Sequence, residues 1–172
     1  MTIHSTHPFA SEPDPVRRFR GRLGGAVTLW TAGEGAGRSG LTVSSLMVAN
    51  GETASVLALV DPDSDFLDVV RETERCVVQG LSWSERALAE MFAGTAPAPG
   101  GAFAHADFEQ TAWGPRLVSA SSWAFVAPID ERVVGWSVLL TCRVEEAGVR
   151  DETEPGLGHR RGRFFPLGSA SD

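Results

Sequence analysis

Three glycines, Gly35, Gly37 and Gly40, form the pattern G-x-G-x-x-G after an apolar run, and Asp61 follows twenty-one residues beyond the last. Such glycines let a backbone approach a pyrophosphate, and an acidic residue about twenty positions on can bind a ribose hydroxyl. The pattern would therefore bind a dinucleotide. That fingerprint also needs a long helix after its third glycine, but residues 41–50, LTVSSLMVAN, contain many poor helix formers. This stretch fits an extended segment better, which favours a hairpin turn or a site for a different cofactor.

Other chemistries find less support in the sequence. There is no G-x-S-x-G nucleophile motif, and the spacing of the histidines places no two of them on one face as metal ligands. We therefore predict neither a catalytic triad nor a metal site, and we assign no catalytic side chain. The four histidines are His4, His7, His105 and His159.

Composition limits the class of protein. The chain has 172 residues, of which 42% are hydrophobic, enough for one domain with a real core. Its formal net charge of −7 argues against nucleic-acid binding. The N-terminus does not resemble a secretory signal, and no apolar run approaches the ~20 residues that span a bilayer. We predict a cytoplasmic protein with a flexible segment 1–12, a single domain 13–168 and a tail 169–172, in which Cys76 and Cys142 are small core residues.

Hydrophobic periodicity and turn residues predict a mainly β chain with a few helices. Ser84 is predicted to cap the third helix and Gly94 to end it. A turn at Pro128–Glu131 is predicted to join the two longest strands. Helices are predicted at 14–23, 63–73 and 84–94, and strands at 25–32, 53–60, 75–82, 116–129 and 131–146.

The order of these segments resembles the flavin reductase-like, FMN-binding split-barrel family. The resemblance covers about residues 16–167 and rests on a set of segments in sequence order: VTLWTA, GLTVSSLMVA, CVVQGLS, EMFAG, GPRLVSASSWAFVA and GHRRGRFFPL. It implies a split β-barrel of Greek-key type with two or three peripheral helices. It also implies a flavoprotein that binds FMN, or alternatively FAD, and takes hydride from NAD(P)H.

The resemblance also implies the residues that contact the cofactor. The segment that resembles LTVSS runs along the flavin edge in this family, so Thr42, Val43, Ser44 and Ser45 are expected there. Ser64 is expected at the FMN phosphate, at the start of a helix. Gln79 is expected at the flavin edge, although an amide on an exposed strand face is an alternative. His159 stands where the family usually has Tyr, and Arg161, like its neighbour Arg160, is expected to reach a phosphate unless this basic run is simply solvated.

Two departures from the family pattern bear on function. Asp65 stands where Thr or Ser is common, and a carboxylate repels a phosphate. Many reductases of this family carry Gly-Asp-His near the nicotinamide, whereas this chain has Gly135 and Trp136 without the histidine. The resemblance implies an NAD(P)H-dependent flavin reductase, with a non-catalytic flavin-, haem- or deazaflavin-binding split-barrel protein as the alternative. A homodimer is expected, and a flavin-dependent monooxygenase is the expected recipient of reduced flavin.

Overall fold

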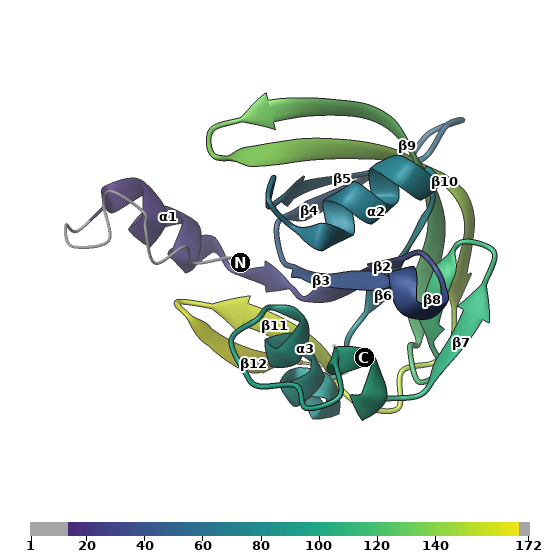
Figure 1. The fold of residues 1–172 in the computed structure, drawn as a ribbon. Coiled ribbons are helices and arrows are strands. Elements are labelled where there is room, and N and C mark those ends of the chain that lie inside the picture. The colour runs from purple at the N-terminus through teal and green to yellow at the C-terminus, as the bar shows by residue number, and fades with distance from the viewer. Residues whose placement is uncertain (1–13, 169–172) are drawn as a thin grey trace.

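The chain folds into a strongly curled β-sheet with helices at its margins (Figure 1), and the computed structural model describes residues 14–168. The predicted flexible segment 1–12 and tail 169–172 lie outside the described residues. The helices and helical turns are α1 (Pro15–Leu23), η1 (Gly35–Gly37), α2 (Asp65–Thr73), η2 (Trp83–Glu85), α3 (Arg86–Phe92) and η3 (Ala102–His105). The strands are β1 (Gly25–Ala26), β2 (Thr28–Ala32), β3 (Ser39–Val43), β4 (Leu46–Ala49), β5 (Ser55–Val60), β6 (Cys76–Gly80), β7 (Phe108–Thr111), β8 (Gly114–Leu117), β9 (Ser122–Val134), β10 (Ser137–Val149), β11 (Gly156–Arg160) and β12 (Arg163–Leu167). The predicted mainly β class is confirmed.

The main sheet has seven strands in the order β3-β2-β6-β9-β10-β5-β4, each antiparallel to its neighbours. Its two edge strands, β3 and β4, follow each other in the chain with only Ser44 and Ser45 between them. The sheet must therefore curl until its edges meet at these two residues. A hydrogen bond of 2.9 Å from the Leu59 N–H to the Ser45 carbonyl fixes the meeting point. The result is the predicted split barrel.

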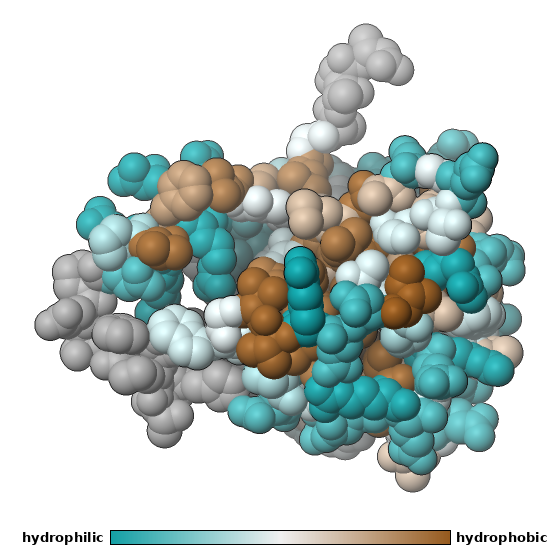
Figure 2. Space-filling model, turned by 90° about the horizontal axis from the view of Figure 1, so that it is seen from above, coloured by the Kyte–Doolittle hydropathy of each residue, from teal (hydrophilic) through white to brown (hydrophobic). Residues whose placement is uncertain are grey.

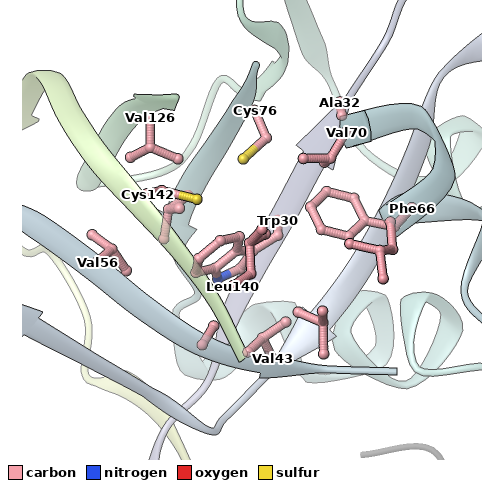
Figure 3. Packing of buried hydrophobic residues seen from close by; sticks show 14 of the residues in the cluster. Trp30, Ala32, Val43, Val56, Phe66, Val70, Cys76, Val126, Leu140 and Cys142 are labelled. Carbon is pink, nitrogen blue, oxygen red and sulfur yellow. The ribbon is translucent and has the colours of Figure 1, made fainter. Parts of the chain in front are cut away.

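Two clusters of buried residues lie on opposite faces of the curled sheet. The first fills its inner face, where Trp30 packs against Phe66 of α2, as Figure 3 shows. Cys76 and Cys142 lie in this cluster, fully buried and unpaired, so their prediction as core residues is confirmed. The second cluster lies beneath α3 and the segment around η3, and includes Leu29, Leu88, Phe92, Leu117 and Leu157.

The glycine-rich stretch 33–40 connects β2 to β3, which pair as an antiparallel hairpin. Within it, η1 is a single helical turn of three residues, and no crossover helix follows. Because a dinucleotide fingerprint opens such a helix, the hairpin interpretation of Gly35, Gly37 and Gly40 is confirmed.

Two local predictions need correction. The turn between the long strands lies at Gly135 and Trp136 rather than at Pro128–Glu131, because β9 continues to Val134. A β-bulge at Ile129 accommodates Pro128 inside the strand, since a bulge removes the need for its missing N–H. Before α3, Ser82 and Glu85 form a capping box around η2, so Ser84 does not cap this region.

The N-terminal helix α1 stands apart from the sheet. Asp14 caps it by accepting a hydrogen bond from the Val16 N–H, and Pro15 occupies its first turn. Beyond α1, β1 joins a small three-stranded sheet with β11 and β12. None of the described helices is long and apolar enough to cross a membrane.

Candidate functional site

Ser44 and Ser45 form the junction at which the two edges of the main sheet meet. Both side chains are half-buried, and neither hydroxyl hydrogen-bonds to any residue within 14–168. Their backbone is nevertheless fixed, because Ser45 accepts the bond from Leu59 and the preceding Val43 carbonyl accepts a 2.8 Å bond from the Thr28 hydroxyl. The junction therefore presents two positioned hydroxyl groups whose hydrogen-bonding capacity is unused by the described chain.

Thr42 and Val43 belong to the same segment but point inward. The Thr42 hydroxyl donates a 2.8 Å hydrogen bond to the Ala89 carbonyl in α3, and Val43 lies in the inner hydrophobic cluster. Their side chains hold β3 between α3 and the core. The expectation that the Thr42 hydroxyl contacts a flavin is therefore not supported by its position.

Gln79 is also an interior residue. Its side chain is 1% exposed, and its amide group donates to the Thr31 hydroxyl at 3.0 Å and to the Pro115 carbonyl at 3.4 Å. Its amide oxygen accepts a 2.6 Å bond from the Leu117 N–H. Gln79 thus ties β6 to β2 and β8, and its amide group is engaged by residues of the described chain.

Ser64 lies at the N-cap of α2, as expected for a residue at the start of a helix. Its hydroxyl donates to the Asp61 carbonyl at 2.8 Å and accepts from the Leu67 N–H at 3.4 Å. Asp65 and Asp68 occupy the first turn, where their charges favour the helix dipole but would repel an anion. The side chain of Ser64 thus orders the start of α2.

His159 and Arg161 belong to the hairpin of β11 and β12. The His159 ring packs edge-on against Phe164, with ring centroids 5.2 Å apart. Partial burial is the main cause that lowers the pKa of His159, and the positive charge of Arg20 contributes less, so the neutral ring is favoured. Arg161 has a left-handed backbone with φ of 53° in the turn, and its side chain is exposed.

Several of these residues lie along one path on the molecule. Gly25 pairs with His159 in the small sheet, and a Cβ atom built on Gly25 would lie 3.3 Å from the Ser44 carbonyl oxygen. Ser44 and His159 therefore flank the same backbone position. On the other side of the junction, Ser45 bonds to Leu59 of β5, the strand that leads into the cap of α2. The junction connects the β11–β12 hairpin to the beginning of α2.

Sequence reasoning missed the residues that support this junction. Trp30 donates its indole N–H to the Thr28 hydroxyl at 3.0 Å, and Thr28 in turn bonds to Val43. The alternation of side chains along β2 could have indicated that Thr28 and Trp30 lie on the same side of the sheet. It could not show that Thr28 would bond to Val43 of β3. No group of three or more His, Cys, Asp or Glu residues that could hold a metal occurs among the described residues.

Comparison with known proteins relates this architecture to flavin chemistry. Residues 20–168 match the family described as the flavin reductase like domain. The FMN reductase (NADH) RutF of Bradyrhizobium diazoefficiens is 31% identical over 133 residues, which cover 77% of this chain and 73% of that relative.

Solved structures show the same fold. The NADH:FAD oxidoreductase SgcE6 of Streptomyces globisporus, solved with NAD and FAD fragments, superposes with a TM-score of 0.79 at 21% identity, over 91% of this chain and 93% of that one. Nitrilotriacetate monooxygenase component B from Mycobacterium thermoresistibile superposes with a TM-score of 0.80 at 18% identity, over 91% and 87% of the two chains.

Proposed function

Because this chain belongs to the family of flavin reductase-like domains and is an NAD(P)H-dependent flavin reductase, we propose that Ser44 and Ser45 bind the edge of its flavin. The observation that carries this proposal is the pair of hydroxyls with no hydrogen-bond partner in the described chain, at a junction whose backbone is fixed on both sides. Thr42, Val43 and Gln79 are not proposed as side-chain contacts, since their side chains are occupied within the interior.

The donor and acceptor groups at the junction fit a flavin. A flavin ring presents carbonyl oxygens, ring nitrogens and one N–H at its polar edge, and a hydroxyl can both donate and accept. The bound flavin supplies the centre that accepts hydride from the nicotinamide, and so the chain needs no acid or base of its own. The protein's contribution is orientation, which Thr28 and Trp30 provide by fixing the carbonyl of Val43 next to the serines.

We propose FMN as the flavin and NADH as the donor, supported by the name of the 31% identical relative. The phosphate is proposed to lie at the start of α2, because the first N–H groups of a helix have no partner inside it. Ser64 orders this helix end, while His159 lies next to the ring-binding junction and Arg161 offers a cation to a phosphate of either nucleotide.

Reduction under anaerobic conditions tests the choice of flavin and donor. NADH should bleach the visible band of bound FMN with saturating kinetics, and kcat/KM should be higher for FMN than for FAD and higher with NADH than with NADPH. Replacing the repulsive carboxylate in Asp65→Ser should raise affinity for FMN about threefold and leave riboflavin unchanged, since an exposed charge near a helix start is worth about 0.5–1 kcal/mol. Equal effects on FMN and riboflavin would place the phosphate elsewhere.

We also propose a homodimer formed through the outer face of β4, β5 and β10. The side chains of Ala58, Val60 and Leu140 point into the core. Because side chains alternate along a strand, those of their neighbours Leu57, Leu59 and Leu139 point outward. Figure 2 shows apolar side chains gathered on the face of the molecule that carries the β9–β10 hairpin. We call these outward residues the outer apolar face: Met47, Leu57, Leu59 and Leu139. A connected apolar surface of this kind favours a partner subunit.

The recipient of reduced flavin is proposed to be a separate flavin-dependent monooxygenase. The structural neighbour that is component B of nitrilotriacetate monooxygenase supports this proposal at the level of the fold. A coupled assay in which a monooxygenase turns over only when this protein, NADH and FMN are all present would test the transfer.

We propose that the single domain acts in the cytoplasm, a reducing compartment that suits its two unpaired cysteines.

A further inference from the structure

Helix α1 has one apolar face and one basic face. Its apolar side chains, Val16, Phe19 and Leu23, follow the spacing of a single helical stripe and are each between 64% and 73% exposed. Its four arginines are Arg17, Arg18, Arg20 and Arg22. No residue of α1 is buried, so within residues 14–168 the stripe is not covered. A surface helix with an apolar stripe normally buries that stripe against another element.

The end of α1 is attached to the small sheet, away from the main sheet of the described chain (Figure 1). The Gly21 carbonyl accepts a 2.8 Å hydrogen bond from the Arg161 N–H, and the Arg22 carbonyl accepts one of 2.8 Å from the Arg160 guanidinium. These bonds fix the last turn of α1 on the β11–β12 turn. Figure 1 shows α1 projecting from this anchor, on the same side of the molecule as the end of the β9–β10 hairpin.

The end of that hairpin is a second exposed apolar surface. Val133 and Val134 directly precede its turn, and both are exposed. We call these two residues the hairpin end. Because the hairpin end and α1 project from the same side, a second copy related by a two-fold axis can place each helix against the other copy's hairpin.

Charge favours a second copy of this chain as the occupant. The nine residues of α1 carry four arginines and no acid, which gives the helix a charge of +4. With a total of −7, the remainder of the chain therefore carries −11. A basic helix is attracted to an acidic body, and two such contacts form at once in a two-fold dimer.

We propose that α1 of each subunit docks its apolar stripe, Val16, Phe19 and Leu23, on the hairpin end of a second copy. This inference rests on the proposed homodimer and adds an exchanged helix to it. The outer apolar face and the exchanged helix would then bury separate surfaces in the same dimer. Each subunit would also brace its partner's hairpin at the turn formed by Gly135 and Trp136.

Cross-linking between two tagged copies tests the exchange. Copies carrying Phe19→Cys and copies with a different tag carrying Val133→Cys are mixed, allowed to exchange subunits and mildly oxidised. A disulfide joining the two tags is expected, and the native Cys76 and Cys142 should not interfere because they are buried. Arg18→Cys, on the opposite side of the same helix, and Val149→Cys, at the far end of β10, are the matched controls and should give at most a tenth of the product.

Dimer dissociation constants measured by sedimentation distinguish a failure of the helix exchange from a failure of the proposed dimer. Phe19→Asp should raise the dimer dissociation constant at least tenfold, whereas Arg18→Asp should raise it less. A monomeric wild-type protein at micromolar concentration would overturn the dimer and the exchange together. A wild-type dimer without the Phe19–Val133 cross-link, or a dimer unaffected by Phe19→Asp, would overturn only the exchange. Co-sedimentation of the wild type, but not of Phe19→Asp, with phosphatidylserine vesicles and without an effect on dimerisation would assign α1 to a membrane surface instead.

Discussion

Thr42 and Ser44 are two residues apart and carry the same functional group, yet they belong to different regions of the molecule. Thr42 is buried beneath α3 and bonds to the Ala89 carbonyl, as Gln79 bonds to three partners deeper in the interior. Ser44 and Ser45 lie where the sheet edges meet, and their hydroxyls have no partner in the described chain. Thr42 and Gln79, the interior group, should therefore contribute to folding, whereas Ser44 and Ser45, the junction pair, should contribute to ligand binding. Substitutions can measure this difference.

The largest effect is expected at Gln79. Gln79→Leu removes three hydrogen bonds and leaves the Leu117 N–H without its partner, so the free energy of unfolding should fall by about 3 kcal/mol. Urea denaturation measures this loss. Gln110→Leu, at an exposed amide, should cost less than about 1 kcal/mol. If folded Gln79→Leu protein binds FMN with more than a few-fold weaker affinity, Gln79 contributes to ligand binding as well as to folding, and the proposed difference between interior and junction residues is wrong.

The next largest effect should appear in binding rather than stability. Ser44→Ala combined with Ser45→Ala removes two ligand hydrogen bonds worth about 1 kcal/mol each, and so the Kd for FMN should rise about thirtyfold. Fluorescence titration gives the Kd, and urea denaturation should show a change in unfolding free energy within about 0.5 kcal/mol. Ser55→Ala on the neighbouring strand β5 is the control. An unchanged Kd in the double variant would refute the proposed flavin contact.

A smaller effect is expected for Thr42→Val. The variant loses the hydrogen bond to Ala89, but the Ala89 carbonyl keeps its bond from the Ala93 N–H, so no buried acceptor is left unpaired. The unfolding free energy should therefore fall by only about 1 kcal/mol, with the Kd for FMN unchanged. A rise in Kd comparable to that of the serine double variant would show that Thr42 belongs with the junction.

The smallest effect concerns acid stability near the junction. Because the pKa of His159 is lowered in the folded protein, the unfolded chain binds more protons as the pH falls below about 6.5. His159 therefore lowers the free energy of unfolding as the pH falls through about 6.5. His159→Phe keeps an aromatic ring against Phe164 and should make the loss of unfolding free energy between pH 7.5 and pH 5.5 smaller than in the wild type. An identical loss would show that His159 is not responsible.

Local patterns predicted much of this fold. The Ser64 cap and the apolar spacing after it identified α2, and glycine content identified the β2–β3 connection. The turn at Pro128 was wrong because a bulge, which depends on the partner strand, can accommodate proline inside a strand. Which strands pair was accessible only through resemblance to a family.

The site was predicted less well because burial of polar groups depends on distant elements. Thr42 and Ser44 look alike in the sequence, and only α3, forty-seven residues further along at Ala89, distinguishes them. Gln79 occupies a position that alternation leaves open to solvent, but β8 covers it from thirty-eight residues away at Leu117. A local pattern carries no information about contacts of this range.

The burial of Cys76 and Cys142 has a consequence for the durability of the enzyme. Reduced flavin that meets oxygen generates hydrogen peroxide, which attacks thiolates in preference to thiols. The contact of Cys76 with Cys142, together with burial, raises the pKa of the Cys76 thiol, and the inner cluster keeps both sulfurs away from solvent. The chain thus carries its thiols where its own by-product cannot reach them.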